Sequence, residues 1–156
     1  MIASFRRNQR VLIFFTLIFS LFVIALVVLA DRGEIDNYMG FLIDLPYADK
    51  VGHFFLIGLL AFLVNLCLAA KTFSVRGWRF LVGSAWVTAI VSAEELSQGF
   101  IPSRTLSFGD WLADIAGIIL FGQLAACLAG RLRRTEKRQA SFISPLVQLF
   151  LVTQLR

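Results

Sequence analysis

Residues 11–30 read VLIFFTLIFSLFVIALVVLA and contain no charged side chain. A helix of about 20 apolar residues is long enough to cross the hydrocarbon core of a bilayer. Similar apolar runs follow at 51–70, 80–99 and 110–130. Lipid offers the backbone no hydrogen bonds, whereas a helix satisfies its own backbone groups internally. The sequence therefore predicts an all-α fold, a bundle of four transmembrane helices at about these ranges.

The composition of the whole chain agrees with this architecture. The chain has 156 residues, of which 58% are hydrophobic and 16% are charged, and its mean hydropathy is +0.80. A soluble domain usually carries about 25% charged residues. These values exclude a soluble enzyme domain, a disordered tail and a disulfide-rich secreted module. We expect a single membrane domain over residues 1–156, because four spans leave no room for a separate soluble domain.

The basic residues are distributed so that they predict the orientation of the spans. Positive charge is concentrated before the first apolar run, between the second and third runs, and after the fourth. The connection 31–50 instead carries five acidic and two basic residues. Short basic segments stay in the cytoplasm, so both termini are predicted to be cytoplasmic. Topology thereby accounts for the net charge of +5, and we expect no nucleic-acid partner.

Both ends of the chain have more than one interpretation. Residues 28–30 resemble a signal-peptide cleavage site, but the first run exceeds the apolar core of about 7–15 residues that a signal peptide has. This length favours a retained first helix. Residues 131–156 are expected to form a basic cytoplasmic tail. Within it, 142–155 is either an interfacial helix starting near Pro145 or a frayed end.

Ionisable and amide side chains of the last three runs gather at the ends that are predicted to be extracytoplasmic. Three separate segments and the connection between the third and fourth runs supply them. Ionisable residues at membrane depth are energetically costly and are candidates for function. These side chains are Asp49, Lys50, His53, Glu94, Glu95, Gln98, Arg104, Asp110 and Asp114.

Helical spacing favours one converging site. Asp49 and His53 are four residues apart and share a helix face. Asp110 and Asp114 share a face in the same way, and Asp114, a turn deeper, requires a partner. Gly117 continues this stripe, where the lack of a side chain would let a neighbouring helix approach closely.

Glu95 is predicted to need a cationic partner. It lies in the last turn of its helix, where the helix dipole disfavours an anion. We predict Arg104 as this partner, with Lys50 as the rival, because a guanidinium matches a carboxylate with two parallel hydrogen bonds. Glu94 points about 100° away from Glu95 and is not expected to face the same centre.

Several of these residues also have purely structural interpretations. Ser107 and Asp110 have the spacing of a helix capping box. His53 by itself is also consistent with a hydrogen-bonded residue at the membrane interface. Asn65 and Gln123 fall in the inner halves of their runs, where they are expected to hydrogen-bond to each other.

Four motifs in chain order resemble the signature of the VanZ-like family. They are DKVGHF (49–54), ELSQ (95–98), FIPSR (100–104) and DWLADIAG (110–117). The family signature runs Lys-x-x-His, then Glu-x-x-Gln with a following Pro-x-Arg, then Asp-x-x-x-Asn-x-x-Gly. The resemblance covers about residues 49–125.

The resemblance implies a set of site residues and a place in the cell. Asp114 departs from the pattern, which has asparagine there, and this puts a strictly neutral role at that position in doubt. The family's namesake is associated with low-level resistance to teicoplanin, a glycopeptide antibiotic with a lipid tail, and many relatives have no known role. The resemblance therefore implies a place more than a reaction, namely a multi-pass protein of the bacterial cytoplasmic (inner) membrane. The residues carried over are Lys50, His53, Glu95, Gln98, Arg104, Asp110 and Gly117.

Four functions are compatible with this pattern. An envelope accessory protein would bind membrane lipid, a lipid-linked cell-wall precursor or a lipoglycopeptide. Lys50 and Arg104 would hold its phosphate or carboxylate, and Gln98 and Asp114 would add contacts. The other functions are a membrane enzyme, a transporter and a purely structural bundle. A transporter is disfavoured because polar residues are scarce near the midplane.

The enzyme hypothesis rests on acid–base chemistry. His53 with Glu95 or Asp110 would act as a general acid–base pair. The same residues with Asp114 are also potential ligands of a divalent metal. The chain has one histidine and no His-Glu-x-x-His motif, so we expect no metal and no other cofactor. Whether any reaction is catalysed is left open at this point.

Overall fold

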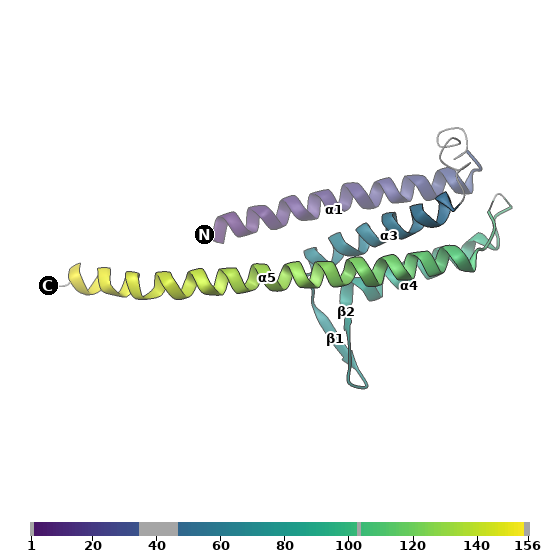
Figure 1. Cartoon of the computed structure of the whole chain (residues 1–156). Coiled ribbons are helices and arrows are strands. Elements are labelled where there is room, and N and C mark those ends of the chain that lie inside the picture. The colour runs from purple at the N-terminus through teal and green to yellow at the C-terminus, as the bar shows by residue number, and fades with distance from the viewer. Residues whose placement is uncertain (1, 35–46, 103, 155–156) are drawn as a thin grey trace.

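The computed structural model describes residues 2–34, 47–102 and 104–154, with side-chain burial described for 9–34, 47–102 and 104–135 (Figure 1). The described chain is mostly helical. Its elements are α1 (Ile2–Asp31), α3 (Ala48–Cys67), β1 (Thr72–Val75), β2 (Trp78–Leu81), α4 (Val82–Gln98) and α5 (Phe108–Gln154).

The four described helices run alternately up and down (Figure 1). The most extensive contacts join α3 to α5, while α1 packs on α3, and α4 packs on both α3 and α5. Both termini lie at one end of the bundle (Figure 1). The connection from α4 to α5 and the start of α3 lie at the other end.

Three helices of the described chain are long and apolar enough to cross a membrane, at Gln9–Asp31, Ala48–Cys67 and Phe108–Thr135. The predicted run 80–99 forms a shorter helix, because Phe80 and Leu81 belong to strand β2. The resulting α4 has 17 residues, which corresponds to a length of about 25 Å.

The small antiparallel sheet of β1 and β2 corrects the all-α prediction. Arg76 and Gly77, both with positive φ, form the turn between the strands. A two-residue hairpin turn of this kind joins strands tightly. Hydropathy alone did not reveal the hairpin, because a short apolar run is compatible with a strand or with the start of a helix.

Helix α5 also differs from the predicted range 110–130. It continues as one helix through the basic segment and through Pro145 to Gln154. Of the two alternatives for 142–155, neither a separate interfacial helix starting near Pro145 nor a frayed end is found up to Gln154. The basic segment lengthens α5 because it contains no glycine or proline before that position.

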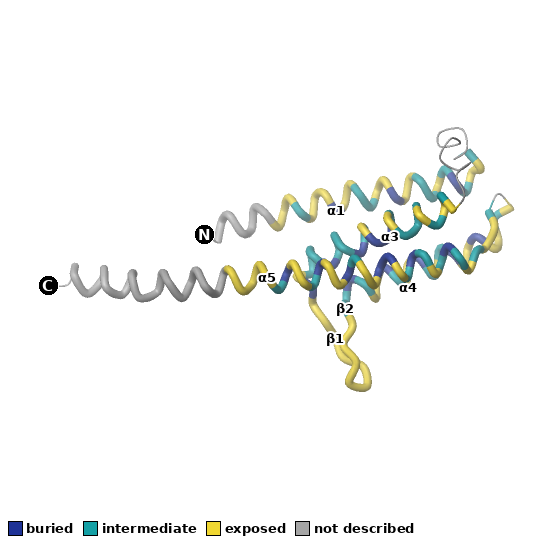
Figure 2. The backbone as a smooth tube through the Cα atoms, in the orientation of Figure 1, coloured by how far each residue is buried: buried dark blue, intermediate teal, exposed yellow. Residues whose placement is uncertain are grey.

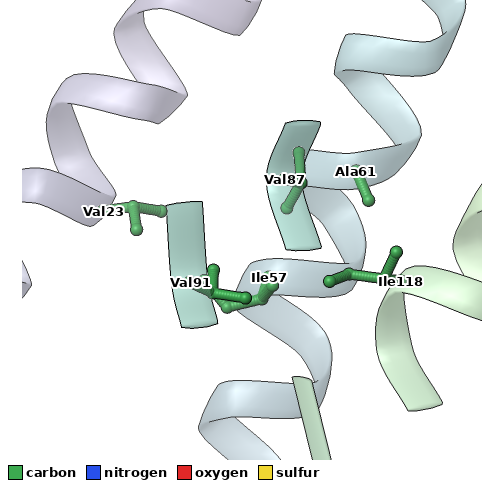
Figure 3. Close-up of a cluster of buried hydrophobic side chains, with 6 residues drawn as sticks. All are labelled: Val23, Ile57, Ala61, Val87, Val91 and Ile118. Atoms are coloured by element: carbon green, nitrogen blue, oxygen red, sulfur yellow. The ribbon is translucent and has the colours of Figure 1, made fainter. Parts of the chain in front are cut away.

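The core is small and draws on all four described helices. Figure 3 shows the buried cluster of Val23 from α1, Ile57 and Ala61 from α3, Val87 and Val91 from α4, and Ile118 from α5. Over residues 9–31, helix α1 buries Thr16, Val23 and Ala30 at seven-residue spacing, and most of the other residues in this range are exposed (Figure 2). Apolar side chains that face outward along this part of α1 are expected where lipid replaces water.

Glycines bring α3 and α5 into backbone contact. A Cβ added to Gly117 would overlap the carbonyl oxygen of Phe54 and lie 3.2 Å from the Cα of Gly58. This confirms the close helix approach that the sequence predicted at Gly117. In the inner half, buried Asn65 donates to the carbonyl of Ala61 and to Ser84 Oγ, each at 2.9 Å.

The predicted hydrogen bond between Asn65 and Gln123 is wrong. Asn65 is fully buried at the contact of α3 with α4, whereas Gln123 is exposed. Gly83 packs directly against the Asn65 side chain, so that α4 approaches near enough for Ser84 to accept the amide hydrogen. The correct partner therefore depends on a helix contact that residue spacing within one helix does not reveal.

Candidate functional site

The polar cluster lies at the end of the bundle opposite the two termini. It takes side chains from the end of α1, the start of α3, the end of α4, the connection 99–107 and the start of α5. We define it by ten residues: Asp31, Asp49, Lys50, His53, Glu94, Glu95, Gln98, Arg104, Asp110 and Asp114.

Two polar contacts join the first turns of α3 and α5. Lys50 Nζ donates to Asp110 Oδ1 at 2.9 Å and also to Asp49 Oδ2 at 2.8 Å. One turn deeper, His53 Nδ1 lies 3.1 Å from Asp114 Oδ1. Residues three and four apart lie above one another on a helix, so the two contacts form successive rungs between the helices.

The His53–Asp114 pair has the geometry of an oriented base. Asp114 is 1% exposed, whereas the His53 side chain is 25% exposed. A buried carboxylate that bonds one imidazole nitrogen fixes the ring and leaves the other nitrogen for proton transfer. No described residue forms a hydrogen bond with Nε2 of His53. The sequence placed Asp114 among the binding residues, and the structure makes it the partner of His53.

Glu95 is held by the start of α5 and not by Arg104, which corrects the predicted pair. The Glu95 side chain is buried at 4% exposure, and its Oε1 accepts from the backbone N–H of Ser107 at 2.7 Å. Ser107 Oγ in turn accepts from the N–H of Asp110 at 3.3 Å, which is one of the two hydrogen bonds of the predicted capping box. The reciprocal bond is absent, because the N–H of Ser107 donates to Glu95 and not to Asp110. The positive end of the α5 dipole therefore supports the Glu95 carboxylate.

Arg104 instead joins α4 to α1. Its guanidinium lies 3.6 Å from Glu94 Oε1 and 3.9 Å from Asp31 Oδ1. Gln98 Nε2 also donates to both carboxylate oxygens of Glu94, each at 3.1 Å. The side chains of Glu94 and Glu95 point in different directions, yet both have partners in the cluster. The cluster therefore extends around two sides of α4.

The structure brings the three predicted catalytic residues into one electrostatic environment. The charges of both Asp110 and Glu95 act on the His53 ring. Glu94 likewise interacts with Arg104, Glu95 and His53. Asp31 was not among the predicted site residues, because nothing in the sequence places the end of α1 beside Arg104. Glu94 was grouped with the candidates, and its four-residue spacing to Gln98 matches their hydrogen bond, but it was not expected to face the same centre as Glu95.

The cluster contains more acidic than basic groups. Six carboxylates face two permanent cations, Lys50 and Arg104, and one histidine. Each of the two cations already contacts two carboxylates. An acidic excess of this kind is better matched to a ligand that brings positive charge or hydrogen-bond donors than to an anion.

An apolar groove adjoins the cluster between α4 and α5. Its volume is about 310 Å³. Trp111 lines it and is fixed by a hydrogen bond from its Nε1 to Ser92 Oγ at 2.9 Å. Glu95 belongs to the cluster and also lines the groove, but it is buried there, and the surface that the groove presents is apolar. The lining residues are Ser92, Glu95, Leu96, Leu106, Phe108 and Trp111.

Within the described ranges, no three His, Cys, Asp or Glu side chains are grouped so that they would hold a metal ion. Comparison with protein-family models, curated proteins and solved structures finds no match to this chain.

Proposed function

We propose that this chain is a four-span protein of the bacterial cytoplasmic membrane, with both termini in the cytoplasm and the polar cluster at the extracytoplasmic face. The three long apolar helices support the membrane location. Helix α4 runs antiparallel to α3 and α5 and exposes apolar residues such as Trp86 and Ile90, as a fourth span would. The basic segments near both termini support the orientation.

Within that membrane, the proposed role is that of a VanZ-like envelope protein that binds an amphipathic molecule of the outer leaflet. The observation that carries this role is the position of Glu95, which is shared by the polar cluster and the apolar groove. A lipid head group, a lipid-linked wall precursor or a lipid-tailed glycopeptide would place its polar part at the cluster. Its hydrocarbon part would lie along the groove beside Trp111.

The contacts refine the chemistry of the head group. Lys50 and Arg104 were expected to hold a phosphate or carboxylate, but carboxylates of the protein already occupy both. Hydroxyl or amine groups of the ligand would instead donate to the excess carboxylates. Glu95 Oε2 has no hydrogen-bond partner among the described residues, but it is buried, so the accessible acceptors are carboxylates such as Asp49 and Glu94.

An acid–base enzyme is the second candidate, favoured by the His53–Asp114 pair. Asp114 would keep the imidazole oriented, and Nε2 of His53 would accept a proton from a hydroxyl of the bound molecule. Asp110 is less suited to this role than the sequence predicted, because Lys50 binds it. Both candidates place the working site in the same cluster.

Antibiotic susceptibility tests the proposed role. Expression of the chain in a susceptible strain is expected to raise the inhibitory concentration of teicoplanin several-fold, and to leave a glycopeptide without a lipid tail unaffected. Glu95→Gln should return it to the vector level, because the amide keeps the shape but loses the charge at the junction of cluster and groove.

Glu34→Gln provides the matched control, since Glu34 lies outside the cluster and undergoes the same chemical change. It should retain the resistance of the parent chain when both are present at equal level in the membrane. If Glu95→Gln confers as much resistance as Glu34→Gln, the cluster has a structural role only. If the parent chain confers no resistance, the teicoplanin proposal is wrong.

A further inference from the structure

The hairpin of β1 and β2 has one entirely apolar face. The register pairs Phe73 with Phe80 and Val75 with Trp78, and these four side chains share a face because neighbours on a strand alternate. They are 40%, 47%, 49% and 75% exposed in the same order. The opposite face carries the pair Ser74 and Arg79.

The hairpin projects sideways from the bundle. In Figure 1 it extends across the direction of the helices, from the level at which α3 ends and α4 begins. A hydrogen bond from the N–H of Val82 to the carbonyl of Lys71, at 2.9 Å, closes its base. If the helices span a membrane, a hairpin in this direction lies along the membrane surface on the side of the termini.

Water is a poor environment for this surface. An isolated two-stranded hairpin is marginally stable in water, and four adjacent exposed apolar side chains would add a hydrophobic patch to it. Tryptophan is enriched where a membrane meets water, because its ring is apolar and its N–H is polar. Trp78 is the most exposed side chain of the apolar face.

Basic groups surround the hairpin. Lys71 precedes β1, Arg76 is in the turn, and Arg79 on the polar face donates to Thr72 Oγ1 at 3.2 Å. Arg133 of α5 donates to the carbonyl of Ala69, at 2.8 Å, and so brings a further cation to the base. Basic groups beside an apolar face are suited to an anionic lipid surface.

We propose that the hairpin is an interfacial membrane anchor. The side chains of Phe73, Val75, Trp78 and Phe80 insert into the head-group region of the leaflet on the side of the termini, and the surrounding cations contact anionic lipid. The ligand is therefore the lipid bilayer itself. This proposal depends on the membrane location of the helices but not on the function of the polar cluster.

A pair of fluorescent probes on opposite faces of the hairpin tests the proposal. Cys67 and Cys127 are replaced with alanine, and single cysteines at Val75 or Ser74 carry an environment-sensitive dye in the full chain. Each variant is placed in nanodiscs that hold one copy of the chain in phosphatidylglycerol and phosphatidylcholine. We expect acrylamide in the water to quench the Val75 probe several-fold less than the Ser74 probe. Nitroxide lipids labelled near the head group should quench mainly the Val75 probe.

The matched pair distinguishes the alternatives. Equal quenching of both probes by acrylamide would overturn the proposal, because the hairpin would then project into water. The measurement is repeated in nanodiscs that hold two copies of the chain. Protection of the Val75 probe in these discs only would also overturn the proposal, because a second chain and not lipid would then cover the hairpin. Replacing phosphatidylglycerol with phosphatidylcholine throughout should raise acrylamide quenching at Val75, and no change would show that anionic lipid is not recognised.

Discussion

Replacing Gly117 with alanine is expected to lower the free energy of unfolding by about 1–3 kcal/mol, the usual cost of overpacking a close contact. The added Cβ would meet the carbonyl oxygen of Phe54 and the Cα of Gly58. Both are backbone atoms, so no side-chain rotation relieves the overlap, and α3 has to move away from α5. These two helices form the most extensive interface of the described chain. Unfolding by a denaturing detergent, followed by circular dichroism, measures the loss.

Gly130→Ala is the matched control on the same helix. A Cβ at Gly130 meets no atom within 4 Å. Alanine also favours a helix over glycine by about 1 kcal/mol, so this variant should be as stable as the parent chain or more stable. If Gly117→Ala unfolds at the same detergent concentration as Gly130→Ala, the close contact of α3 and α5 is wrong.

Removing the His53 side chain is also expected to lower the free energy of unfolding. His53→Ala leaves Asp114, which is 1% exposed, without its hydrogen-bond partner. Removing the partner of a buried acceptor costs about 1–3 kcal/mol, because the acceptor is left without a hydrogen bond. The same detergent unfolding experiment should detect this loss of stability.

Two further variants distinguish the effect of the unpaired Asp114 carboxylate from the effect of losing the His53 side chain. Asp114→Asn keeps an oxygen that accepts from Nδ1 of His53, so its stability should stay near that of the parent chain. His53→Ala combined with Asp114→Leu removes both polar groups and should recover most of the stability that His53→Ala loses. If the double variant is as unstable as His53→Ala, the pair does not account for the loss.

Much of the fold was predictable because membrane spans have a strong sequence signal. The apolar runs at 11–30 and 110–130 lie within α1 and α5, respectively. The run at 51–70 overlaps α3 and continues past its last residue, Cys67. The run at 80–99 was less well predicted, since its first residues pair with Thr72 and Phe73 in the hairpin. Strand pairing depends on a second segment, so the hydropathy of one segment does not reveal it.

The sequence was sufficient to predict which residues form most of the candidate site, but not which of them contact one another. Depth and helical spacing placed Lys50, His53 and Asp110 near one another, and the structure agrees. The partner of Glu95 was wrong because it depends on the path of the connection 99–107, which returns the N–H of Ser107 to the end of α4. Spacing along a helix carries no information about that path.

The sidedness of the polar cluster tests the central claim most directly. Single cysteines at Thr105, beside the cluster, and at Ser74, on the polar face of the hairpin, are both in exposed positions. In a background without Cys67 and Cys127, an impermeant maleimide added to intact cells should label only the cysteine at Thr105. The cysteine at Ser74 should react only after the membrane is opened. Labelling of Ser74 but not Thr105 in intact cells would place the cluster in the cytoplasm and contradict the proposed function.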